Sequence, residues 1–372
     1  MAQRVNGRDA RIELMRLAAC LGVIMIHIPN RITMMDAITC NAVMVFFAIT
    51  GCFWFKTKRG YGRVALHFAL TVLAPLLVMN TFAQIFNAWF DDPSWAIDAS
   101  QLALPDIGRT LRGILKMDYT YWPQTGGHLW YVSDFTELLL FYVPMRLVAT
   151  HPDRRIRWGV TLLCFCPVVI LELSHVLPES VTAWLPGVRL IFPSYFVMMM
   201  LGQELYAERE RYASKGWKCA FAGLVIFGGI TLVRWLFSEK VPTTDGSAPY
   251  LTLISLFTFA SLPAIFMIFM PMKLPEGLAR PVRAVASLTY GIYLVHGVVI
   301  RKLTAVGWLD GLFQRCLGLT PKPYLDYFVY GALASLMIFA VCAALVLPFR
   351  LLRAGLGRLI RAAVPARNGG NA

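Results

Sequence analysis

The chain has 372 residues, of which 58% are hydrophobic and only 15% are charged, and its mean hydropathy is +0.60. Soluble domains carry roughly 25% charged residues, so this composition excludes a soluble enzyme and predicts an integral membrane protein. In a soluble protein the net charge of +14 would suggest nucleic-acid binding. Here it does not, because basic residues beside apolar segments usually set membrane topology.

Ten apolar runs come close to the roughly 20 residues that a helix needs to cross a bilayer. They cover residues 12–29, 37–55, 64–89, 128–148, 157–174, 189–206, 217–237, 251–271, 284–301 and 327–349. The predicted fold is therefore an all-α integral membrane bundle of about ten transmembrane helices. We expect one polytopic domain over residues 1–352 and a basic tail over residues 353–372.

The Lys and Arg residues gather on one side of this predicted bundle. Of the 35, 24 lie in or next to the N-terminus, the connections after even-numbered helices, or the C-terminus. Since basic connections stay in the cytoplasm, both termini are expected there.

The first predicted helix carries two strongly polar residues, Arg16 and His27. Eleven residues of helix rise about 16.5 Å and complete nearly a whole number of turns, so both would share one face. A strongly polar side chain inside a membrane costs a few kcal/mol and is a functional candidate by default. The pair suggests a path through the bundle, with a cation at the inner mouth and an acid/base group deep along it. Arg16 could equally be an interfacial cation, and His27 could make a helix-packing hydrogen bond.

Further polar residues are expected at the depth of His27. His128 and Tyr131 begin the fourth helix from the outer side, and Tyr293 and His296 lie three apart on the ninth. The pattern predicts an outward-facing polar site. Three histidines could instead bind zinc, but no spacing such as His-Glu-x-x-His supports this, and no metal is expected.

Several other polar features have ordinary structural interpretations. A stripe on the third helix could hydrogen-bond between helices, and residues 107–116 could form a helix lying in the membrane interface. The polar stripe on the third helix consists of Asn80, Gln84 and Asn87.

A structural ion pair is expected for each of four intramembrane charges, namely Asp134, Glu137, Glu172 and Arg234.

Four short motifs occur in order along the chain. They are Arg16 with His27, Phe46 to Gly51 with Thr50 as its hydroxyl residue, His128 to Tyr131, and Gly291 to His296. With them the chain resembles the membrane acyltransferase-3 family, which includes bacterial exopolysaccharide and lipopolysaccharide O-acetyltransferases. The family's second element has Ser where this chain has Thr50, and the hydroxyl is kept.

The resemblance implies an O-acetyltransferase of the bacterial inner membrane. It would move acetyl from cytoplasmic acetyl-CoA, the donor substrate, to a hydroxyl of an extracytoplasmic or lipid-linked glycan. It also implies His27 as the catalytic residue and Arg16 as a contact to CoA, with the basic residues Lys58, Arg59 and Arg63. The expected partners are acyl-CoA, a glycan acceptor and membrane lipid, and no nucleic acid.

The chemistry of histidine fits this role, because its ordinary pKa of about 6.5 lets the neutral ring accept a proton from a sugar hydroxyl. A covalent acyl-histidine would use the same residue. The developing oxyanion would need a donor, for which His128, Tyr131, Tyr293 and Thr50 are candidates. Two other function classes stay open: a transporter or flippase of a lipid-linked glycan, and a non-catalytic partner in polysaccharide synthesis. The sequence lacks the internal repeat typical of transporters.

Overall fold

A computed structural model describes residues 8–79, 82, 130–174, 195–240, 255–319 and 323–363. Within these ranges all regular structure is helical, which confirms the predicted all-α class. The helices are α1 (Ala10–Met25), α2 (Thr33–Thr39), α3 (Asn41–Trp54), α4 (Tyr61–Phe68), the π-helical turn η2 (Ala69–Leu73), α7 (Trp130–Leu140), α8 (Tyr142–Ala149), α9 (Arg154–Ser174), α11 (Tyr195–Ala207), α12 (Arg209–Ser214), α13 (Gly216–Lys240), α14 (Leu256–Phe269), α15 (Glu276–Ala286), α16 (Thr289–Ala305), α17 (Trp308–Cys316) and α18 (Pro323–Ala363).

Each of the ten predicted crossings contains at least one of these helices. Judged by length and composition, and among the described residues only, four helical stretches could cross a membrane. They are Thr33–Trp54, Tyr61–Met79, Gly216–Ser238 and Tyr324–Leu352. A fifth is obtained if α15 and α16, which are bent by 55°, form one broken span. Membrane character is therefore supported, whereas the number of ten crossings stays a prediction.

Proline residues interrupt several of the shorter helices. A proline ring clashes with the carbonyl four residues earlier and lacks an N–H. Pro29 thus explains why α1 ends at Met25 instead of continuing to residue 29, and Pro144 explains the break at Phe141 between α7 and α8. The π-helical turn η2 directly precedes Pro75. These helices are therefore short because prolines in the sequence end or interrupt them.

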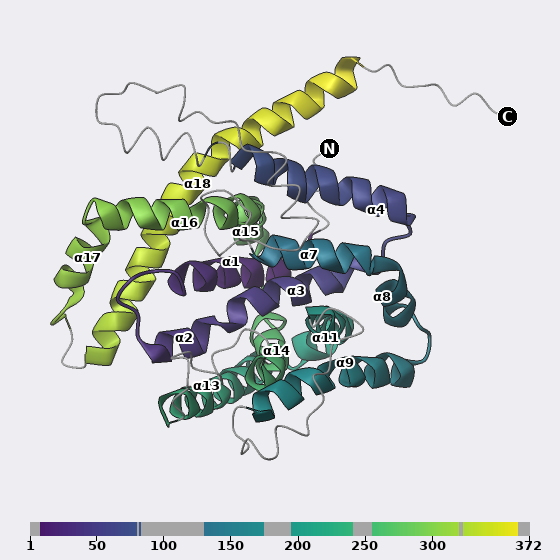
Figure 1. Cartoon of the computed structure of the whole chain (residues 1–372), viewed down its shortest axis with the longest axis horizontal. Helices are drawn as coiled ribbons and strands as arrows, with labels where there is room; N and C mark the ends of the chain where they lie inside the picture. The colour runs from purple at the N-terminus through teal and green to yellow at the C-terminus, as the bar shows by residue number, and fades with distance from the viewer. Residues whose placement is uncertain are drawn as a thin grey trace.

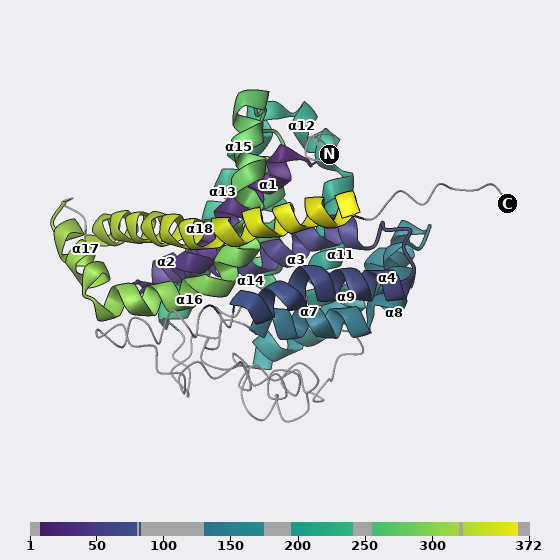
Figure 2. The ribbon, with the colours of Figure 1, turned by 90° about the horizontal axis from the view of Figure 1, so that it is seen from above.

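Successive helices alternate in direction along the long axis of the molecule (Figures 1 and 2). In Figure 1, α1, α4, α9 and α16 run from right to left, and α3, α7 and α18 run from left to right. The end of α18 and the connections from α3 to α4 and from α8 to α9 lie toward the right in Figure 1, whereas α1 begins nearer the middle, where Arg11 contacts Met270 and Glu210. Helix α18 continues to Ala363, so the first part of the predicted tail is helical.

Helix α3 is enclosed between α1 and α11. It meets α11 backbone to backbone, since a Cβ atom added at Gly51 would overlap the backbone of Met199, and one added at Gly202 would overlap that of Ala48. On the other side, a Cβ at Gly22 of α1 would lie 2.8 Å from the Cβ of Ala42. Small residues allow this close approach, which gives apolar helices the packing that holds them together in lipid.

We expect Gly51→Ala and Gly202→Ala each to destabilise the protein by about 1–3 kcal/mol or more, because each methyl group meets backbone, which cannot move aside. Matched controls are Gly228→Ala and Gly229→Ala on α13, where nothing lies within 4 Å of the added atom. These should be neutral or slightly stabilising, since Ala favours helix over Gly. Unfolding of the purified protein in detergent measures the difference. Equal stability of the Gly51 and Gly229 variants would contradict the proposed contact.

Candidate active site

Two histidines from distant parts of the sequence meet at the end of α1. The rings of His27 and His296 are 5.2 Å apart between centroids. His27 lies in the turn after α1, where its backbone N–H donates to the Ile24 carbonyl at 3.0 Å. The predicted continuous helix from Arg16 to His27 is therefore wrong over its last turn, because Pro29 ends α1 at Met25. The histidine is positioned by a turn instead of a helical face.

The two histidines differ in environment. His296 is completely buried, at 0% exposure, whereas the His27 side chain is exposed. Nδ1 of His296 lies 2.6 Å from the backbone carbonyl of Tyr293, one turn earlier in α16. A carbonyl oxygen can only accept, so Nδ1 carries the proton of this hydrogen bond and Nε2 is the acceptor nitrogen of the neutral ring. The bond also fixes the ring's orientation toward His27.

Aromatic rings continue the cluster from the histidines into the bundle. The Tyr293 ring lies 5.8 Å from that of His296 and 5.5 Å from that of Tyr131, whose ring is 4.6 Å from Phe47. The Tyr293 hydroxyl accepts from the backbone N–H of Tyr131. The structure thus brings together four predicted site residues, His27, Tyr131, Tyr293 and His296, from the α1 turn, α7 and α16. His128 lies outside the described residues, and the catalytic roles stay predictions.

The second sequence motif packs directly against this cluster. The hydroxyl of Thr50 on α3 donates to the Phe46 carbonyl at 2.8 Å. Thr50 also hydrogen-bonds to Tyr131, and in this bond the Tyr131 hydroxyl donates to the Thr50 oxygen. The next residue, Gly51, forms the contact with α11 described above. In this motif the Thr50 hydroxyl therefore hydrogen-bonds to the tyrosine cluster, while Gly51 packs against α11.

Sequence reasoning missed two tyrosines beside the site. Tyr195 stacks on Phe47 at 4.4 Å and hydrogen-bonds to Asp134, for which an ion pair had been expected. The Tyr290 hydroxyl donates to the Val72 carbonyl in the π-helical turn at 2.8 Å. The spacing of three residues from Tyr290 to Tyr293, and from Tyr131 to Asp134, was the available signal, since such residues share a helix face.

The other predicted intramembrane charges lie apart from this cluster. Arg234 is completely buried and donates to two neutral oxygens, those of Asn41 and Thr258, each at 3.3 Å. The side chain of Glu172 lies outside the described residues, as do Asn80, Gln84, Asn87 and the predicted interfacial helix. Within the described ranges no three His, Cys, Asp or Glu side chains are grouped in a way that could hold a metal ion.

Arg16 is held by a carboxylate that the sequence analysis overlooked. Its guanidinium lies 2.7 Å from Glu13, one turn earlier in α1, and Arg8 approaches the same carboxylate at 4.0 Å. Glu13 is only 3% exposed. A buried carboxylate requires such partners, because its desolvation is otherwise costly. Arg16 is thus oriented before any ligand binds, and part of its charge is already balanced.

The beginning of α1 is anchored against the end of α14 and against α12. Asp9 caps the helix by accepting from the backbone N–H of Arg11 at 3.0 Å, and the Arg11 guanidinium donates to the Met270 carbonyl at 3.1 Å. Burial alone would raise the pKa of Asp9, but the hydrogen bonds and charge of Arg11 outweigh it and lower that pKa below its ordinary value.

The basic residues after α3 lie at the right of the molecule in Figure 1. Lys58, Arg59 and Arg63 are exposed in the α3–α4 connection and first turn of α4. All three are cations like Arg16, so no ion pair can join them to it, and their part in donor binding stays a prediction.

A family model described as an acyltransferase domain matches residues 9–347. The chain belongs to the acyltransferase-3 family. The matched range contains every described residue of the cluster, and the resemblance seen in the four motifs is confirmed. Membership supports membrane acyltransferase activity in general. No curated protein and no solved structure matches the chain significantly.

We expect a double-mutant cycle on this acyltransferase-3 protein to give a coupling of about 1.5–3 kcal/mol between Glu13 and Arg16, because the carboxylate is buried and the hydrogen bond is charge-assisted. The control is Glu208 with Arg211, which has the same spacing but an arginine side chain that is 71% exposed. Its coupling should stay below about 1 kcal/mol. Unfolding of the Ala variants in detergent measures both. Equal couplings would show that Glu13 does not orient Arg16.

Proposed function

We propose that this protein is a membrane O-acyltransferase that moves acetyl from cytoplasmic acetyl-CoA to a hydroxyl of an extracytoplasmic or lipid-linked glycan. Family membership supports acyl transfer in general. The observation that carries the rest is the contact of exposed His27 with buried His296 at one end of α1, while the Arg16–Glu13 pair lies nearer the other end.

The proposed reaction uses His27 as a general base. The acceptor hydroxyl loses its proton to the imidazole while its oxygen attacks the thioester carbonyl. The new C–O bond forms, the C–S bond breaks, and the proton passes from His27 to the departing thiolate. Tyr293, beside the His296 ring, and Tyr131, beside Tyr293, are the described candidates for stabilising the oxyanion. An acyl-His27 intermediate would use the same neighbours.

The proposed orientation has ten crossings with both termini in the cytoplasm, in the bacterial inner membrane. Its support is the distribution of Lys and Arg along the sequence, together with the position of the basic α3–α4 and α8–α9 connections and the end of α18 toward one end of the molecule (Figure 1). The exposed cations of the α3–α4 connection would then face the compartment that contains acyl-CoA. The phosphates of CoA need charge-assisted contacts of this kind.

We expect His27→Ala to lower kcat/KM by about 10²–10⁴, the usual contribution of a general base, without loss of expression or thermal stability, because the side chain is exposed. His67→Ala on α4 is the matched control, since it removes another exposed histidine, and it should keep full activity. Acetyl transfer from labelled acetyl-CoA to the envelope glycan fraction gives the rate. A well-folded His27→Ala variant with near-normal activity would exclude His27 and favour a non-catalytic role.

A second experiment tests sidedness in sealed vesicles of known orientation. Acetyl-CoA should act only from the cytoplasmic face, and the acetylated product should appear on the opposite face. Arg16→Lys should raise the KM for acetyl-CoA less than Arg16→Ala, since lysine keeps the charge but not the planar fork. If donor and acceptor are both used from the cytoplasmic face, the transmembrane path is wrong even if transfer occurs.

A further inference from the structure

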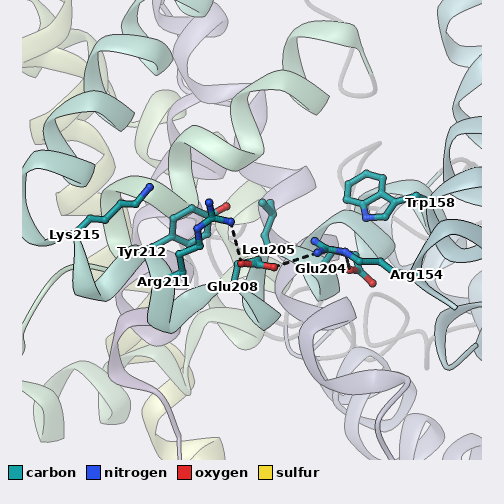
Figure 3. A pocket seen from close by; sticks show the side chains of 8 residues that line it. All are labelled: Arg154, Trp158, Glu204, Leu205, Glu208, Arg211, Tyr212 and Lys215. Atoms are coloured by element: carbon teal, nitrogen blue, oxygen red, sulfur yellow. Dashed lines mark hydrogen bonds and ion pairs between the residues drawn. The ribbon is translucent and has the colours of Figure 1, made fainter. Parts of the chain in front are cut away.

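A charged pocket of about 370 Å³ lies between α9, α11, α12 and the start of α13 (Figure 3). Figure 3 shows Trp158 at one side, Tyr212 and Lys215 at the other, and a row of charged side chains between them. The pocket is lined by Arg154, Trp158, Glu204, Leu205, Glu208, Arg211, Tyr212 and Lys215. Neither the motifs nor the proposed reaction uses these residues.

The two carboxylates of the pocket are already neutralised by arginines. Buried Glu204 accepts from Arg157 at 2.7 Å and from Arg154 at 3.1 Å. Glu208 lies 3.3 Å from Arg154 and 3.7 Å from Arg211. A ligand of this pocket therefore meets little uncompensated negative charge.

Uncompensated positive charge lies at the pocket's edge. Lys215 and Lys218 form no ion pair with any residue that the structure describes, and they flank Gly216, where a candidate membrane span begins. Trp217 between them is 73% exposed, as is typical of an aromatic residue at the membrane surface. The two lysines thus lie at the depth of lipid headgroups.

An apolar groove of about 400 Å³ adjoins the charged pocket and shares Tyr212 and Lys215 with it. Its other lining residues are Lys218, Cys219, Ala222 and Met267. Beyond it, α13 exposes Phe221 and Leu224, large apolar side chains that suit contact with acyl chains. A cationic rim therefore opens onto an apolar groove along a membrane helix.

The position of the pocket argues against the acyl donor as its ligand. It lies on the side of α11 that faces α9 and α13, whereas α3 and α1 lie on the other side (Figure 1). The backbone contact at Gly51 and Gly202 closes the seam between α3 and α11. A thioester arm bound in this pocket has no passage there toward His27.

We propose that the pocket and groove bind one anionic phospholipid. The phosphate lies among Arg211, Lys215 and Lys218, and an acyl chain follows the groove past Ala222 and Met267. Basic pockets between membrane helices bind anionic headgroups by this combination of charge and apolar contact. The bound lipid bridges α12, α13 and α14 and does not take part in transfer.

Native mass spectrometry of the full chain, exchanged into phosphatidylglycerol or phosphatidylcholine, tests the proposal. Wild type should retain one phosphatidylglycerol in preference to phosphatidylcholine, and retention should weaken with added salt. The Lys215→Ala/Lys218→Ala variant should bind phosphatidylglycerol roughly tenfold or more weakly, because each interfacial cation contributes about a factor of five. The control Lys273→Ala/Arg280→Ala removes the same charge from exposed positions outside the pocket and should bind as wild type does.

A charge-reversal variant, Lys215→Glu, serves as a second test should the double variant fold poorly, and it should lose the preference for phosphatidylglycerol. Equal retention of both lipids by wild type would overturn the proposal, as would undiminished retention by the variants. Competition by glycerol phosphate at the same concentration as the lipid would also overturn it, and would indicate a site for free phosphate. The readout is lipid retention, so it is independent of whether the protein transfers acetyl groups.

Discussion

The direct backbone contact between α3 and α11 is the constraint on which the other features depend. Lipid tails are as apolar as the helices, so association relies on close packing, and Gly51 and Gly202 permit it. The contact fixes the rotation of α3, and the same helix then presents Phe47 and Thr50 to the tyrosines of the candidate site. It also closes the bundle between that site and the charged pocket.

Interruptions in the helices bring polar groups to the candidate site that uninterrupted helices would position elsewhere. Pro29 ends α1 early, so His27 lies on a turn that brings its ring to His296. The π-helical turn before Pro75 contains the Val72 carbonyl that accepts from the Tyr290 hydroxyl. Such turns are frequent at functional sites. The prolines therefore contribute to the site as well as limiting the length of the helices.

Two buried carboxylates of the bundle are balanced in one consistent way. Glu13 lies between Arg8 and Arg16, and Glu204 lies between Arg154 and Arg157. Burial of an unpaired carboxylate would be costly, so some of the positive charge from which the orientation was predicted is also needed for packing. The exposed cations outside these pairs are the ones available for donor phosphates and lipid headgroups.

The sequence by itself determined the all-α membrane class, the family, and most of the residues of the candidate site, because composition, helical period and short motifs are local properties. Only the tertiary structure decided the partners: Glu13 for Arg16, Tyr195 for Asp134, and the oxygens of Asn41 and Thr258 for Arg234. Helical period gives the face on which a residue lies but not the helix that this face meets. The pocket beside α13 likewise depends on packing, because α9 contributes Arg154 and Trp158 to a pocket whose other residues lie on the consecutive helices α11 and α12 and at the start of α13.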